Sequence, residues 1–224
     1  MAKSSSKIQA ITFDVGGTLI SPWPSVGHVY AEVALRNGFV PPSPQLLNER
    51  FGKAWRACAM FDYTRRGWEE LVQETFQFPG GSVPFFADLY ERFTEPDVWK
   101  VFDDVKPALD AVASQRVKLA VISNWDERLR LLLDRVGLAQ YFESQFISCE
   151  VGAPKPSRVI FDRAASVLKV DPAAILHVGD SLEMDVHGAR NARFQAVLLD
   201  RGQDVETEMT VPNLLSLVRR IECA

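Results

Sequence analysis

Polar side chains follow short apolar segments at several points along the sequence. They are Asp14, Ser123 with Asn124, Lys155 and Asp180. Taken singly, Asp, Ser and Asn in such positions most often cap a helix or stabilise a turn. Two carboxylates, an ammonium group and a hydroxyl gathered in one place exceed what solubility requires. Their spacing therefore predicts a shared reactive site.

Alternating strands and helices would bring these side chains together. Apolar runs predict strands at 8–13, 117–122, 145–149, 174–179 and 195–199. Helical periodicity predicts helices at 107–113, 129–136, 156–168 and 183–192. This alternation is typical of an α/β fold in which a doubly wound, mostly parallel sheet carries helices on both faces. Ligands of such sheets bind beyond the carboxyl ends of the strands, where the polar side chains are expected to meet.

The segment from about residue 25 to 95 has a different pattern. Its apolar residues recur with helical spacing, Pro41-Pro42 and Gly67 divide it, and it contains no convincing strand. We therefore predict a core of residues 1–20 and 101–224, with residues 21–100 inserted as an all-helical domain.

Composition narrows the possible partners. The chain has 224 residues, of which 47% are hydrophobic, and 25 Lys and Arg against 29 Asp and Glu give a net charge of −4. These values are typical of a globular protein, and they leave no concentrated basic face for nucleic acid. No apolar run has the length of a membrane-spanning helix, and the N-terminus lacks the apolar region of a signal peptide. We expect a small-molecule substrate, no nucleic acid and no membrane.

The cysteines are three in number and far apart: Cys58, Cys149 and Cys223. They have neither the spacing of a zinc site nor the density of a disulfide scaffold. Reduced thiols in a cytoplasmic protein are expected.

Four motifs occur in order at the predicted strand ends. They are Phe13-Asp14-Val15-Gly16-Gly17-Thr18-Leu19, Ile122-Ser123-Asn124, Lys155-Pro156-Ser157 and Gly179-Asp180-Ser181-Leu182-Glu183-Met184-Asp185. With this set the chain resembles the haloacid dehalogenase-like hydrolase superfamily. Residues 123–129 and 176–181 are similar to the subgroup named for rhythmically expressed genes. The resemblance implies a Rossmann-like core, and the helical insertion is similar to the first cap class of the family.

The resemblance also implies a role for each acidic group. Asp14 would be the nucleophile, attacking phosphorus to form an aspartyl-phosphate that water then hydrolyses. A divalent cation must offset the repulsion between this carboxylate and a phosphate dianion. The implied cofactor is Mg²⁺, and its ligands would be Asp14, the Gly16 carbonyl, Asp180 and Asp185.

The remaining motif residues would act on the phosphoryl group. The predicted phosphate-binding set is Gly16, Gly17, Thr18 and Asn124, in which glycine N–H groups approach the oxygens and Thr18 also suits a turn-stabilising role. Ser123 would donate to a phosphoryl oxygen. Lys155 would hold Asp14 ionised and offset negative charge in the transition state. Asp14, Ser123 and Lys155 are thus the predicted catalytic residues.

One position departs from the phosphatases and mutases of the family. Those enzymes have a second aspartate two residues after the nucleophile, which protonates the leaving group and then activates water, and here that position is Gly16. A positioned acid–base group contributes about 10² to 10⁴ in rate, so we expect weak attack on alkyl phosphates. Gly16→Asp should raise that activity if the rest of the site is intact.

Three functions stay open on this basis. The first is a magnesium-dependent phosphohydrolase acting on a small phosphorylated metabolite, with a good leaving group or a substitute acid. The second is a metal-independent carbon-centre hydrolase of the 2-haloacid dehalogenase type, which fits the missing aspartate but has little use for two further acidic groups. The third is a catalytically weak protein that keeps the fold for binding. The phosphohydrolase ranks first.

Two residues adjacent to the motifs, His177 and Trp125, each allow a functional and a structural interpretation. His177 lies within the apolar run 175–178 and is expected to be a buried, hydrogen-bonded histidine and not a catalytic one. Trp125 follows the second motif closely enough to shape the floor of a pocket, but core packing is the favoured interpretation.

Overall fold

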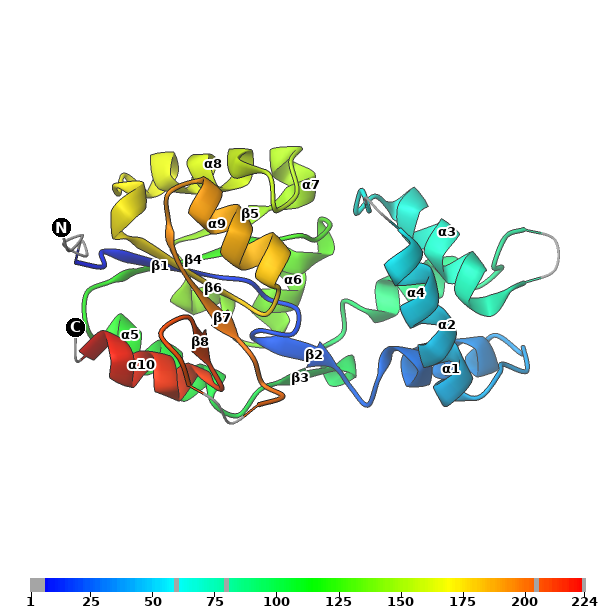
Figure 1. Ribbon diagram of the computed structural model, residues 1–224. Coiled ribbons are helices and arrows are strands. Elements are labelled where there is room, and N and C mark those ends of the chain that lie inside the picture. The colour runs from blue at the N-terminus through cyan, green and yellow to red at the C-terminus, as the bar shows by residue number, and fades with distance from the viewer. Residues whose placement is uncertain (1–6, 59–60, 79–80, 204–205, 223–224) are drawn as a thin grey trace. The chain divides into compact units, whose positions relative to one another are not determined.

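A computed structural model describes residues 7–58, 61–78, 81–203 and 206–222, so Cys223 lies outside the described residues. The chain divides into two compact units (Figure 1). The α/β unit contains residues 1–20, 101–127 and 137–224, and the helical unit contains residues 21–100 and 128–136. The predicted core and insertion have the same breaks after residues 20 and 100. Residues 128–136, expected in the core, group with the helical unit instead.

The sheet of the α/β unit has six strands in the order β5-β4-β1-β6-β7-β8, and each adjacent pair is parallel. The strands are β1 (Ala10–Phe13), β4 (Lys118–Ser123), β5 (Ser144–Ile147), β6 (Ile175–Gly179), β7 (Gln195–Leu199) and β8 (Thr210–Val211). The predicted parallel α/β fold is confirmed. The two-residue strand β8 escaped prediction because so short a segment has no periodicity to detect.

Helices cover both faces of this sheet. Figure 1 shows α8 and α9 over one face and α5 and α10 over the other. The helices of the unit are α5 (Val105–Ala113), α7 (Ser148–Val151), α8 (Arg158–Leu168), α9 (Gly188–Asn191) and α10 (Leu214–Glu222), with short turns η2 (Ala139–Tyr141) and η3 (Pro172–Ala174). The predicted helix 183–192 is in fact a π-helix, η4 (Leu182–His187), followed directly by α9. Strands buried on both faces explain the nearly continuous apolar runs in the sequence.

The register of β1 places the motif ends side by side. Phe13, the last residue of β1, is level with Val121 of β4 on one side and with Val178 of β6 on the other. The residues that follow these three strands therefore meet at one edge of the sheet, as expected for the carboxyl ends of parallel strands.

The helical unit is built around aromatic side chains. Its helices are α1 (Val26–Arg36), α2 (Pro44–Ala57), α3 (Arg65–Phe76), α4 (Phe86–Arg92), α6 (Arg128–Arg135) and the turn η1 (Pro96–Val98). Tyr30 is stacked on Phe76, with ring centroids 5.6 Å apart. Helix α6 is held by Arg128, which donates to the Tyr90 carbonyl at 2.6 Å, and by Arg135, which donates to the Thr94 carbonyl at 3.1 Å. These bonds explain why α6 groups with this unit.

Two short strands, β2 (Ile20–Pro22) and β3 (Trp99–Val101), pair where the chain passes between the units. None of the helices in the described ranges combines the length and apolarity needed to cross a lipid bilayer.

Candidate active site

Asp14 is held at the end of β1 by its backbone and its carboxylate. Its N–H donates to the Val178 carbonyl of β6 at 2.9 Å, and the residue is only 7% exposed. The Ser123 hydroxyl at the end of β4 donates to Asp14 Oδ1 at 2.9 Å, and Lys155 Nζ donates to the same oxygen at 2.7 Å. Because both bonds end on Oδ1, Oδ2 has no hydrogen bond from any described residue and is left available to a ligand.

Lys155 joins two carboxylates. It is 3% exposed, and its Nζ donates to Asp14 Oδ1 and, at 2.6 Å, to Asp185 Oδ1. Burial alone would lower the pKa of Lys155, but the charges of Asp14 and Asp185 outweigh burial and raise it. The loop that carries Lys155 is fixed by Asn124, whose amide donates to the Lys155 carbonyl at 3.0 Å and accepts from its N–H at 2.7 Å. The ammonium group is thus charged and held in place.

Asp185 has three hydrogen-bond partners. Besides Lys155, His177 Nε2 lies 3.1 Å from its Oδ1, and the Ser181 N–H donates to its Oδ2 at 2.9 Å. His177 is fully buried and its Nδ1 lies 2.9 Å from the Thr12 hydroxyl, so the predicted buried, hydrogen-bonded histidine is confirmed. Burial raises the pKa of Asp185, but Lys155 and then His177 lower it more, and the net pKa lies below the usual value. Burial lowers the pKa of His177, partly opposed by Asp185.

Asp14, Asp180 and Asp185 can hold a cation. One carboxylate oxygen from each lies within 4.8 Å of the others. Within the described parts of the chain, Lys155 is the one Lys or Arg bonded to these three carboxylates, so the ionised set keeps two negative charges in excess. Burial of the carboxyl, and then the charges of Asp14 and Asp185, raise the pKa of Asp180 to about 7. A hard divalent cation with oxygen ligands, such as Mg²⁺, fits this donor set and would relieve the repulsion.

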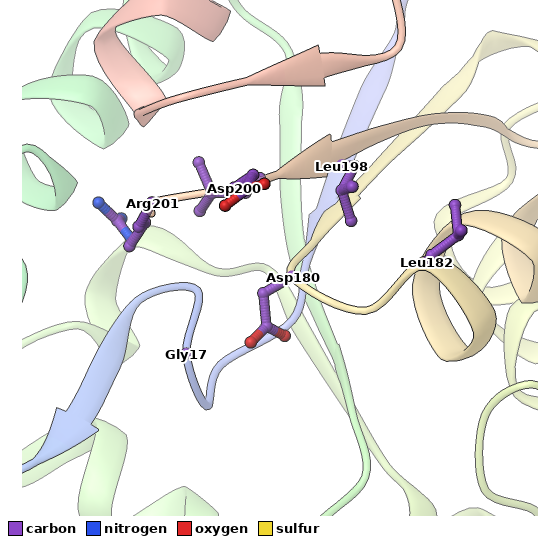
Figure 2. Close-up of a pocket in the computed structure, with 7 residues that line it drawn as sticks. Gly17, Asp180, Leu182, Leu198, Asp200 and Arg201 are labelled. Carbon is purple, nitrogen blue, oxygen red and sulfur yellow. The ribbon is translucent and has the colours of Figure 1, made fainter. Parts of the chain in front are cut away.

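Asp180 is reached from solvent through a pocket of about 310 Å³ (Figure 2). The pocket is lined by Gly17, Asp180, Leu182, Leu198, Leu199, Asp200 and Arg201. In Figure 2 the Asp180 carboxylate points toward the loop at Gly17. A hydrated cation could therefore approach Asp180 without disturbing the buried pair of Lys155 and Asp185.

Two glycines make room for the acidic cluster. Gly17 has a φ of +76°, and a Cβ there would lie 2.1 Å from Asp180 Oδ2. A Cβ on Gly179 would lie 2.2 Å from Cγ of Asp185. Any side chain at these positions would displace a carboxylate, and at position 17 it would also strain the backbone.

The loop after β1 is clamped by a residue outside the four motifs. Arg201 donates to the Thr18 carbonyl at 2.8 Å and to Asp104 Oδ1 at 2.9 Å, and its guanidinium lies 3.9 Å from the centre of the Phe102 ring. Nothing in the local sequence around Arg201 indicates this role, because its partners come from distant segments.

The structure brings together the side chains predicted to be catalytic and acidic: Asp14, Ser123, Lys155, Asp180 and Asp185. Two predicted phosphate-binding residues lie differently. Asn124 uses its amide on the Lys155 backbone and is a positioning residue. Thr18 is fully buried and its Oγ1 has no hydrogen-bond partner among the described residues, so the hydroxyl stabilises the turn through no side-chain hydrogen bond. A phosphate or metal role for the Gly16 backbone stays a prediction.

Comparisons with known proteins identify the family of the chain. A profile of the haloacid dehalogenase-like hydrolases matches residues 8–193. Haloacid dehalogenase-like hydrolase domain-containing protein 3 of Bos taurus is 31% identical over 207 residues, covering 86% of this chain and 82% of that protein. The Rhythmically expressed gene 2 protein of Drosophila melanogaster is 26% identical over 254 positions, covering 98% and 97%. The crystal structure of a HAD phosphatase from Thermococcus onnurineus has a TM-score of 0.71 at 26% identity, covering 96% of this chain and 98% of that one. The chain therefore belongs to the haloacid dehalogenase-like hydrolase family, in the subgroup similar to the Rhythmically expressed gene 2 protein.

Proposed function

We propose that the protein is a Mg²⁺-dependent phosphohydrolase that acts on a small phosphorylated metabolite through an aspartyl-phosphate on Asp14. The observation that carries this proposal is the position of the Asp14 carboxylate, bonded to Lys155 and Ser123 and grouped with Asp180 and Asp185. A carboxylate can attack phosphorus only where positive charge offsets its repulsion by the phosphate. The site has one fixed ammonium group and ligands for a divalent cation.

In the first step Asp14 Oδ2 attacks phosphorus, and the bond from phosphorus to the leaving oxygen breaks. The Ser123 hydroxyl and Lys155 Nζ both donate to Asp14 Oδ1 in the free site. We expect them to donate to the transferred phosphoryl group during this step. Bound Mg²⁺, held by Asp14, Asp180 and Asp185, would supply charge neutralisation at the phosphoryl oxygens.

In the second step water attacks phosphorus, and the bond between phosphorus and the Asp14 oxygen breaks. Phosphate is released and the carboxylate is regenerated. Position 16 has no carboxylate to take the proton from water, because it is glycine. We therefore expect this step to be slow compared with family members that keep the second aspartate.

The acidic cluster also bears on the second candidate, a metal-independent dehalogenase. Attack on carbon needs a single carboxylate, and two more acidic groups close to it would only raise its pKa. The excess negative charge around Asp14 therefore favours phosphoryl transfer with a cation. We further propose that the helical unit, most of which is inserted between residues 20 and 101 of the α/β unit, selects the substrate.

Release of inorganic phosphate from acetyl phosphate, with and without Mg²⁺, tests the proposal. We expect Mg²⁺-dependent turnover by the intact chain and none by Asp14→Asn. Halide release from 2-chloropropionate in the presence of a chelator would favour the dehalogenase instead. If the folded protein shows neither activity, the phosphohydrolase assignment is wrong and a binding role takes its place.

A further inference from the structure

The side chain of Trp125 lies over Gly16, the position that lacks the second aspartate. A Cβ built on Gly16 would lie 3.2 Å from Cζ3 and 3.9 Å from Cη2 of Trp125. Contacts of 3.2 Å are tighter than ordinary van der Waals distances between carbon atoms. The backbone at Gly16 is outside the left-handed region, so its conformation does not require glycine. It is the indole ring that leaves little room for a side chain there.

The ring is attached to a fixed segment of backbone. The Trp125 N–H donates to the Ser148 hydroxyl at 3.0 Å, and that hydroxyl donates to the Trp125 carbonyl at 3.1 Å. The same carbonyl accepts from the Cys149 N–H at 3.3 Å. Ser148 is buried at the start of α7. Since the loop after β4 is tied to α7 in this way, the ring cannot move aside without losing these bonds or changing its rotamer.

The part of the ring that faces Gly16 has no proton to give. Cζ3 and Cη2 belong to the six-membered ring, on the side away from the indole N–H. The place from which an acid at position 16 would reach the leaving group is therefore bordered by aromatic carbon.

We propose that Trp125 is a specificity-determining residue that occupies the acid–base position and limits the enzyme to phosphates whose leaving group departs unprotonated. The substrate class is then acyl phosphates and phosphate esters of acidic hydroxyls, not alkyl phosphates. This inference rests on the proposed function. In the first step the bond from Asp14 to phosphorus forms, and the electron pair of the broken bond leaves on a carboxylate or phenolate oxygen. In the second step water supplies the oxygen of the released phosphate, and its proton passes to that phosphate or to solvent.

The test is the dependence of kcat/KM on the leaving group, measured with acetyl phosphate and a series of aryl phosphates whose phenols have increasing pKa. For the intact enzyme we expect kcat/KM to fall steeply as the phenol pKa rises. The sequence alone predicts that Gly16→Asp raises activity on poor leaving groups. With Trp125 over this position we instead expect Gly16→Asp alone to change kcat/KM for the poorest substrate by less than about threefold, because the ring obstructs the new side chain. Gly16→Asp with Trp125→Ala should flatten the dependence and raise kcat/KM for that substrate at least about tenfold, which is less than the factor of about 10² to 10⁴ that a fully positioned acid–base group contributes.

Matched variants separate the effect of the carboxylate at position 16 from the effect of added side-chain volume there. Gly16→Ala with Trp125→Ala adds the Cβ without the carboxylate and should keep the steep dependence. Trp125→Ala alone should also keep it. Should Trp125→Ala fail to fold, Trp125→Leu takes its place, because leucine is apolar but does not reach position 16 as far as indole does.

The outcomes are distinct. A shallow dependence in the intact enzyme, or a flattening by Gly16→Asp alone equal to that of the double variant, would overturn the role of Trp125 while leaving the phosphohydrolase intact. Failure of the double variant to flatten the dependence would overturn it as well. Absence of Mg²⁺-dependent acetyl phosphate hydrolysis would instead overturn the proposed function and the substrate class with it.

A thermal denaturation cycle checks the contact itself without any activity. Gly16→Ala should lower Tm in the natural chain but not in the Trp125→Ala background. Equal shifts in the two backgrounds would contradict the contact.

Discussion

Replacing Lys155 by methionine removes the one positive charge bonded to two buried carboxylates. Methionine has an unbranched side chain one heavy atom shorter than that of lysine, and it loses the bonds of 2.7 Å to Asp14 and 2.6 Å to Asp185. A hydrogen bond to a charged group contributes about 1.5–3 kcal/mol, and breaking a buried ion pair costs about 3–5 kcal/mol. We expect Lys155→Met to lower the free energy of unfolding by about 4 kcal/mol at pH 8.

The loss should depend on pH. Burial raises the pKa of Asp14 even with Lys155 present, and removing the lysine raises it further. A carboxyl with a raised pKa in the folded state is most stable when protonated, so its contribution is present at low pH and lost as pH rises through that pKa. Asp185, whose pKa is lowered in the natural chain, contributes stability that is present above its ordinary value and disappears on acidification. The gap between variant and natural chain should therefore widen as pH rises from about 4 to 8.

Urea denaturation at pH 5 and pH 8, with and without Mg²⁺, measures the difference in unfolding free energy between Lys155→Met and the natural chain. Added Mg²⁺ should restore part of the lost stability, since a cation replaces the missing positive charge. Lys118→Met is the matched control, because Lys118 Nζ donates one bond of 2.8 Å to the Leu168 carbonyl and no carboxylate is involved. It should cost about 1 kcal/mol at both pH values. A loss of less than about 1 kcal/mol for Lys155→Met, or one equal at both pH values, would refute the electrostatic reasoning.

Three further predictions concern the acidic cluster. His177→Leu removes the bond to Asp185 and should weaken Mg²⁺ binding about 10- to 100-fold in titration calorimetry, whereas an unchanged Kd would exclude a positioning role. Gly17→Ala should destabilise the chain and weaken Mg²⁺ binding, because its Cβ would collide with Asp180. Gly38→Ala is the control for the backbone cost, since Gly38 has a φ of +79° and a Cβ there would have no atom within 4 Å. The control should leave Mg²⁺ binding unchanged. Because the pKa of Asp180 is raised to about 7 and the cation binds the ionised form, Mg²⁺ affinity should increase as pH rises through that value, and a Kd independent of pH between about 6 and 8 would speak against Asp180 as a ligand.

The predictable part of the site follows from the ends of the strands. Asp14, Ser123 and Asp180 could be placed together from the sequence because parallel strands of one sheet end at one edge, and the register of β1 with β4 and β6 produces that arrangement. Lys155 belongs to a loop, and its reach to Asp14 depends on the bonds that Asn124 makes with its backbone. The sequence predicts that the Asn124 amide binds phosphate, but in the structure it bonds to the Lys155 backbone. A motif indicates which residues lie close together but not which hydrogen bonds they form.

Other features depend on packing between distant segments and have no local signal. Helix α6 has the periodicity of any amphipathic helix, and only its arginine contacts with Tyr90 and Thr94 decide to which unit it belongs. In the sequence, Arg201 resembles an ordinary surface arginine. Only the folded structure shows that it bonds to Thr18 and Asp104. These assignments need coordinates.

The most direct test of the account is the covalent state of Asp14 during turnover. The chain is mixed with acetyl phosphate and Mg²⁺, quenched in acid, digested and examined by mass spectrometry. We predict one phosphoryl group on the peptide that contains Asp14, accumulating in the steady state because Gly16 offers no base to activate water, removed by hydroxylamine and absent from Asp14→Asn. Steady turnover with Asp14 unmodified, or turnover that survives in Asp14→Asn, would contradict the central claim.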